Sequence, residues 1–177
     1  MGNLLFSPNG RIGPSDFLRG LAMLALVAAV IAIAPLINYS LASILSLASL
    51  LIAIPTFFIL IKRCHDAGKS GWMSILFFIM ILFITGLLQY FAQQATGGEE
   101  MAAMKAASQE LATSGAGFGE IMTQTAALAE EYGPAIAKNT ALATAIAGFV
   151  GTMLGGYLTN LMLKQEPHEN RFGPAPM

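Results

Sequence analysis

The chain has 177 residues, of which 55% are hydrophobic and 11% are charged, whereas an ordinary soluble domain carries about 25% charged residues. Nine Lys and Arg residues against ten Asp and Glu residues leave a net charge of -1, which gives no basic field to bind nucleic acid. One cysteine and two histidines exclude an internal disulfide and argue against a structural zinc site. Composition therefore favours a membrane protein, and we expect neither a metal nor a cofactor.

Three membrane-spanning helices are predicted in residues 1–91. No charged side chain occurs from Gly20 to Ile61, and this run is long enough for two crossings because one crossing needs about 20 residues. Polar and helix-breaking residues between Pro35 and Ser40 divide it, and a further apolar run begins at Trp72. The predicted spans are residues 17–37, 41–61 and 72–91.

Residues 92–139 are expected to form a helical hairpin, because apolar residues recur at helical spacing on both sides of the break SGAGFG. The apolar stripe is narrow and rich in Met and Ala, so it is covered by the membrane interface, its own bundle or a partner, or else packs loosely at the surface. The uncharged residues 140–163 predict a fourth span, followed by a tail over residues 164–177. The predicted fold is an all-α, polytopic membrane bundle of four transmembrane helices, with an extracytoplasmic hairpin between the third and fourth.

The distribution of basic residues predicts which way the chain faces. If four spans alternate, every Lys and Arg except Lys105 and Lys138 falls on one side. Because Lys and Arg residues are retained on the cytoplasmic side, we expect both termini and the turn between the second and third spans in the cytoplasm. The hairpin, with its surplus of glutamates, then lies on the opposite side.

The stretch KRCHDAGKSGW, residues 62–72, contains the candidate site. Its GKS lacks the first glycine and the soluble flanks of a phosphate-binding loop, and successive residues on a helix do not face one another as a catalytic triad does. We expect a turn at the level of the lipid headgroups, where cations meet a helix C-terminus and anionic lipid and a tryptophan anchors the next helix. The candidate residues for ion pairs or headgroup binding are Arg11, Arg63, His65, Asp66, Lys69, Trp72 and Arg171.

The sequence leaves the roles of two residues in this stretch open. Asp66 needs cationic partners beside an anionic membrane surface, and Arg11 or Arg171 from the tails are candidates besides its neighbours Arg63 and Lys69. His65 either senses pH or binds a headgroup phosphate, or it holds the loop by hydrogen bonds.

The fourth span has small residues at every fourth position, including a GxxxG pair. Small residues let helices approach closely where lipid offers no hydrophobic drive for association. This face packs either within the four-helix bundle or against another integral protein or a second copy. The predicted packing face is Ala147, Gly148, Gly151, Thr152, Gly155 and Gly156.

Three separate stretches carry a family resemblance. They are F..NGRIG...F from Phe6, KRCHDAGKSGW from Lys62 and ENRFGPAP from Glu169. Together they resemble the YhaH-like bacterial inner-membrane proteins, domain-of-unknown-function family 805. The resemblance implies a small multi-pass protein of a bacterial cytoplasmic membrane and brings no established activity with it. Since members of that family usually run almost directly from the third span to the last motif, residues 92–139 resemble an insertion.

Three classes of function follow. Between Gly20 and Ile61, and inside the third and fourth spans, there is no ionisable side chain other than tyrosines, and intramembrane charge is the usual mark of an ion path. We therefore expect a non-catalytic accessory or scaffold subunit that packs on a larger membrane complex through the fourth span and the hairpin. Its expected partners are membrane lipid and another integral membrane protein or a second copy. The alternatives are a small oligomeric transporter or channel, favoured by Pro55 in the second span, and a lipid-headgroup-binding enzyme using His65 and Asp66.

Overall fold

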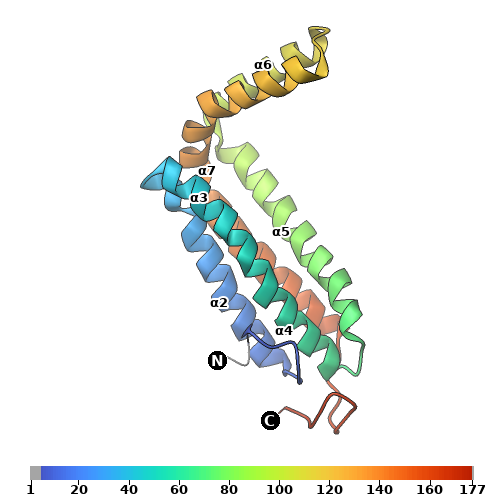
Figure 1. The fold of residues 1–177 in the computed structure, drawn as a ribbon. Coiled ribbons are helices and arrows are strands. Elements are labelled where there is room, and N and C mark those ends of the chain that lie inside the picture. Colours follow the sequence, from blue (N-terminus) through green and yellow to red (C-terminus); the bar gives the residue numbers. More distant parts are fainter. Residues whose placement is uncertain (1–4, 177) are drawn as a thin grey trace.

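The computed structural model describes residues 5–176, and within that range the chain is built from helices with no strand (Figure 1). Four helical segments are long and apolar enough to cross a membrane. The predicted all-α fold with four such helices is therefore confirmed. Figure 1 shows an elongated bundle with both termini at one end and a helical hairpin bent away from the opposite end.

The first crossing is α2 (Pro14–Ala32), which continues into a short 3-10 helix, η1 (Ala34–Leu36). It begins before the expected Phe17, because proline fits the first turn of a helix, where its missing N–H would have no partner. Asp16 lies in that first turn, where a negative charge is favoured by the helix dipole.

The second crossing runs from Tyr39 to Asp66 as α3 (Tyr39–Ser49), the 3-10 turn η2 (Leu50–Ile52) and α4 (Ala53–Asp66). Asn38 caps its start by accepting a hydrogen bond from the Leu41 N–H at 2.9 Å. The 3-10 turn lies directly before Pro55, which cannot donate to the carbonyl one turn earlier. At its other end the helix continues beyond the predicted end at residue 61 to Asp66. It therefore includes the beginning of the KRCHDAGKSGW stretch.

The third crossing is η3 (Gly71–Met73) followed by α5 (Ser74–Thr96). A sharp turn at Gly98, whose φ is +67°, leads into α6 (Gly98–Thr113). The last helix, α7 (Phe118–Met162), has 45 residues and contains both the second half of the hairpin and the fourth crossing. The boundary expected at residue 139 is thus not a break in the backbone, and the hairpin and fourth span share one helix.

The small-residue face of α7 is covered within the chain. A Cβ on Gly151 would lie 2.7 Å from the Thr85 Cα in α5, and one on Gly156 would lie 2.3 Å from Leu21 in α2. The Thr152 hydroxyl lies 3.3 Å from that of Thr85. Helix α7 therefore stands between α2 and α5, and its small residues permit the close approach.

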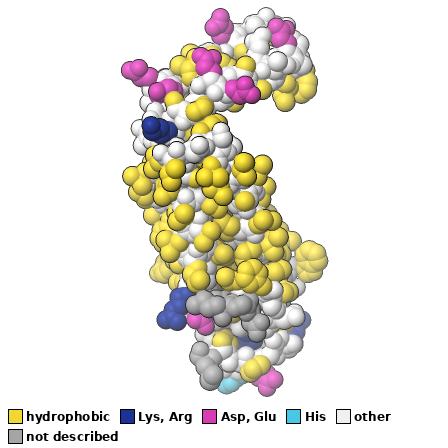
Figure 2. Space-filling model, turned by 60° about the vertical axis from the view of Figure 1, so that its left-hand side comes forward, with side chains coloured by type: hydrophobic (Ala, Val, Ile, Leu, Met, Phe, Trp, Pro, Cys, Tyr) yellow, Lys and Arg dark blue, Asp and Glu magenta, His cyan; other side chains and the backbone are white. Residues whose placement is uncertain are grey.

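The outside of the bundle is apolar. Figure 2 shows hydrophobic side chains over the middle of the molecule, with acidic side chains gathered on the hairpin and charged groups again at the other end. Exposed leucine, isoleucine and phenylalanine side chains come from every crossing helix. Such a continuous apolar belt is stable in lipid and not in water, so the chain is a multi-pass membrane protein.

Gly151→Ala is expected to lower the free energy of unfolding by about 1–3 kcal/mol, because the added methyl overlaps the backbone of α5. Gly86→Ala on α5 is the matched control, since nothing lies within 4 Å of its Cβ position. Reversible unfolding in detergent micelles measures both variants. Equal stability of the two would contradict the α5–α7 packing.

Candidate functional site

The three sequence motifs, distant along the chain, meet at the end of the bundle where both termini lie (Figure 1). The N-terminal segment supplies Arg11, the end of α4 supplies Arg63 and Asp66, and the tail after α7 supplies backbone carbonyls. We call Arg11, Arg63 and Asp66 the arginine clasp.

Asp66 is the centre of the clasp, and its side chain is fully buried. One carboxylate oxygen, Oδ2, accepts a hydrogen bond from Arg63 Nη1 at 2.9 Å. The other, Oδ1, accepts from Arg11 Nη2 at 3.1 Å. Both arginine side chains are only 1% exposed. The Asp66 carboxylate therefore holds two cations from different parts of the chain, and its own carbonyl accepts from the Glu166 N–H at 2.9 Å.

Arg63 joins α4 to the end of α7. Its Nε donates to the Asn160 side-chain oxygen at 2.7 Å, and its Nη2 donates to the carbonyl of Leu163, which caps α7. Asn160 in turn donates to the Pro14 carbonyl at the start of α2, at 3.1 Å. A guanidinium at a helix C-terminus is favoured because the last carbonyls have no partner within the helix.

Arg11 joins the N-terminal segment to the tail. Its Nη1 donates to the carbonyls of His168 at 2.7 Å and Gly173 at 3.1 Å, and its Nη2 donates to that of Glu166 at 2.5 Å. With the Asp66 contact, the planar guanidinium of Arg11 thus contacts four acceptor residues in fixed directions. Lysine presents a point charge instead of this fork and could not replace it.

His65 holds the same two segments on the other side of α4. Its Nδ1 donates to the Gly10 carbonyl at 3.3 Å, since a carbonyl can only accept. Its ring stacks on Phe172 with 3.9 Å between ring centroids and 7° between planes. Asn170 donates to the His65 carbonyl at 3.0 Å. Through these contacts His65 holds the loop against the N-terminal segment and the tail.

The remaining predicted residues lie outside the clasp. Lys69 and Arg171 are exposed, and neither belongs to an ion pair among residues 5–176. The Arg171 guanidinium lies over the Phe172 ring, 4.6 Å from its centroid. Trp72 is 80% exposed at the start of the third crossing, where an indole suits the membrane interface.

Lys62 and Arg63 lie at the C-terminal end of α4, where the sequence analysis expected cations, but both side chains are buried. Asp66, the last residue of α4, is buried as well, and the turn to the third crossing is formed only by the residues that follow. The charges of Arg63 and Asp66 are buried because the clasp and the carbonyls of the tail replace the solvent around them. Sequence reasoning also missed Asn160, which a single amide in an otherwise apolar span could have indicated, and Glu166, for which we find no such signal.

No group of three or more His, Cys, Asp or Glu side chains in the described part of the chain is arranged to hold a metal ion. The only acidic side chain of the clasp is already paired with two arginines.

The comparison with family models finds a match over most of the chain. The model described as "Protein of unknown function (DUF805)" matches residues 5–174. The chain belongs to the DUF805 family. The match contains all the residues of the arginine clasp, and its range also extends across the hairpin, which the sequence analysis interpreted as an insertion. Comparisons with curated proteins and with solved structures give no significant match.

Asp66→Asn is expected to destabilise this DUF805 protein by about 3–5 kcal/mol, because it leaves two buried arginines without a counter-charge. Asp16→Asn is the matched control: its ion pair with Arg19 is exposed, with side chains 53% and 77% exposed, so the loss of this pair and of the charge at the start of α2 changes stability by no more than about 1 kcal/mol.

The fully buried Cys64, the one cysteine of the chain, reports the opening of the clasp. A maleimide is expected to label Cys64 slowly in the wild type and in Asp16→Asn, and much faster in Asp66→Asn. Equal labelling rates in all three would show that the clasp does not hold this end of the bundle closed.

Proposed function

We propose that this DUF805 protein is a non-catalytic subunit of a larger membrane assembly, in which the hairpin contacts the partner and the arginine clasp holds the bundle together. One observation carries the proposal: the hairpin presents an open groove outside the crossing helices, with no other segment of the described chain covering it.

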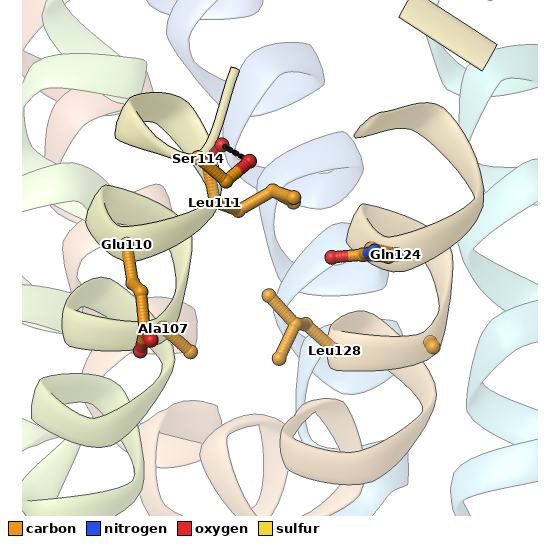
Figure 3. Close-up of a pocket in the computed structure, with 7 residues that line it drawn as sticks. Ala107, Glu110, Leu111, Ser114, Gln124 and Leu128 are labelled. Carbon is orange, nitrogen blue, oxygen red and sulfur yellow. Dashed lines mark hydrogen bonds between the residues drawn. The ribbon is translucent and has the colours of Figure 1, made fainter. Parts of the chain in front are cut away.

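The groove lies between α6 and the first half of α7. Figure 3 shows Leu111 and Leu128 facing each other across it, with Gln124 on the α7 side and Glu110 on the α6 side. The Ser114 hydroxyl closes the end of α6 by donating to the Leu111 carbonyl at 2.8 Å. An apolar floor with a polar rim is typical of a protein–protein contact surface.

The charge of the hairpin indicates the chemistry of the partner. Its acidic residues exceed its two lysines, Lys105 and Lys138, and Figure 2 shows acidic side chains gathered on it. A basic surface is complementary to this field and is drawn towards it. The acidic side chains of the hairpin are Glu99, Glu100, Glu110, Glu120, Glu130 and Glu131.

The contacts of the clasp and of His65 support a structural role in preference to catalysis. A general acid or base must reach its substrate, whereas both oxygens of the buried Asp66 accept from arginines and His65 Nδ1 is bound to Gly10. The fourth span was expected to contribute to partner contact, but α2 and α5 cover its small residues. The proposed contact is therefore restricted to the hairpin.

The basic residues around the clasp support an orientation with both termini in the cytoplasm and the hairpin on the outer face of a bacterial inner membrane. The partner then offers a basic surface on that outer face.

Ala127→Arg is expected to weaken partner binding by about tenfold or more, because it fills the groove and reverses the charge there. Ala126→Arg is the matched control, since Ala126 is the exposed neighbour of Ala127 on α7 and does not line the groove. Purification in mild detergent, followed by native gels and mass spectrometry, measures the yield of the complex.

Three results would contradict the proposal. The wild-type chain could migrate on native gels without a partner, or the Ala127→Arg and Ala126→Arg variants could retain the partner equally. In a Cys64→Ser chain, Ala126→Cys, which lies outside the groove, could resist an impermeant maleimide in whole cells and react only after lysis, which would place the hairpin on the cytoplasmic side.

A further inference from the structure

A second hollow, separate from the hairpin groove, lies beside the clasp. Its volume is about 440 Å³. It extends from the apolar surface of α4 to the turn that precedes α5, and the clasp does not use it. The residues that line it are Phe57, Ile61, His65, Ser70, Gly71, Trp72 and Phe172.

We propose that this hollow binds one anionic phospholipid. An acyl chain lies along Phe57 and Ile61, and the phosphate lies at the other end, near His65 and Ser70.

The apolar half of the hollow runs along a helix that crosses the membrane, as an acyl chain does. Phe57 and Ile61 are four residues apart on α4, so they share one face of a helix that crosses the membrane. Trp72, at 80% exposure, borders the hollow at the end of the crossing, and indoles prefer the level where chains meet headgroups. A lipid in the bilayer reaches this hollow without leaving its leaflet.

The polar half of the hollow has hydrogen-bonding groups that the fold leaves available. Because Nδ1 of His65 donates to Gly10, its other ring nitrogen is directed to the Gly71 side, where a Cβ would lie only 3.2 Å from Nε2. In the neutral ring this Nε2 has no proton and can only accept, so His65 donates to a phosphate only when the ring is protonated. Ser70, an exposed residue, adds a hydroxyl at the same edge.

The charge around the polar half favours an anion. None of the lining residues is acidic. Lys69 directly precedes Ser70, and the Arg171 guanidinium is 4.6 Å from the Phe172 ring, which stacks on His65. Unlike Arg11 and Arg63, these two cations are not neutralised by an ion pair in the part of the chain that the structure covers. A zwitterionic headgroup would leave this positive charge without compensation, whereas an anionic one compensates it.

The experiment uses Trp72, the one tryptophan of the chain, as the reporter. The full-length protein is placed in phosphatidylcholine vesicles that contain a small fraction of phosphatidylglycerol, and the bromine label is on the acyl chains of either lipid. If the hollow selects the anionic lipid, brominated phosphatidylglycerol quenches Trp72 fluorescence more strongly than the same fraction of brominated phosphatidylcholine. Equal quenching by the two lipids would overturn the proposal.

Lys69→Gln with Arg171→Gln is expected to reduce the preference for phosphatidylglycerol by about fivefold for each cation removed. Lys105→Gln with Lys138→Gln removes the same charge at the hairpin and is expected to leave the preference unchanged. A preference that survives the first pair, or that both pairs reduce equally, would show that Trp72 reports only bulk lipid. Displacement of the quenching lipid by inorganic phosphate would show that the hollow binds free anions instead.

Discussion

The buried carboxylate of Asp66, held between Arg11 and Arg63, fixes the end of the bundle where four chain segments meet. Taking these charges out of water is costly, and the cost is offset only if each donor and acceptor finds a partner. The structure meets this condition with the Asn160 amide and the carbonyls of the tail. In a membrane, where apolar helices gain little by contacting each other instead of lipid, such polar contacts determine how the helix ends are arranged.

Helix α7 connects the clasp to the rest of the molecule. Its 45 residues correspond to roughly 70 Å measured along the helix, which contains Pro134 and bends where the hairpin leaves the bundle (Figure 1). One helix therefore connects the hairpin groove to Asn160 and the Leu163 carbonyl. Gly151 and Gly156 bring it against α5 and α2 along the way. The proposed partner surface and the clasp are therefore two ends of one packed element.

Much of the fold could be predicted because apolar runs in a membrane protein form helices, and the four crossings follow from their length and lack of charge. The exact ends of these helices could not be predicted, because they depend on local details such as Pro14 at the start of α2. The continuity of α7 was missed because a change from polar to apolar composition at residue 139 was interpreted as a structural boundary. A helix can continue through such a change, since its backbone hydrogen bonds do not depend on the polarity of the side chains.

The sequence indicated a stretch in which charges gather, but the geometry of these charges was not predictable. The lone acid among several cations indicated that Asp66 needs partners. The choice of Arg11 over Lys69 and Arg171 depends on the path of the tail, whose carbonyls receive the remaining donors of Arg11. The burial of Arg63 was not predictable, because no pattern in the sequence shows which carbonyls converge on a guanidinium.

The most direct test of the clasp is a double-mutant cycle with Arg11→Met, Asp66→Asn and the two combined, measured as free energies of unfolding in detergent micelles. If the two side chains stabilise the fold through each other, the combined variant loses less than the sum of the single losses, with a coupling of about 2–3 kcal/mol. Losses that add to within about 0.5 kcal/mol would show that Arg11 and Asp66 act independently and that no clasp joins the tails to the bundle.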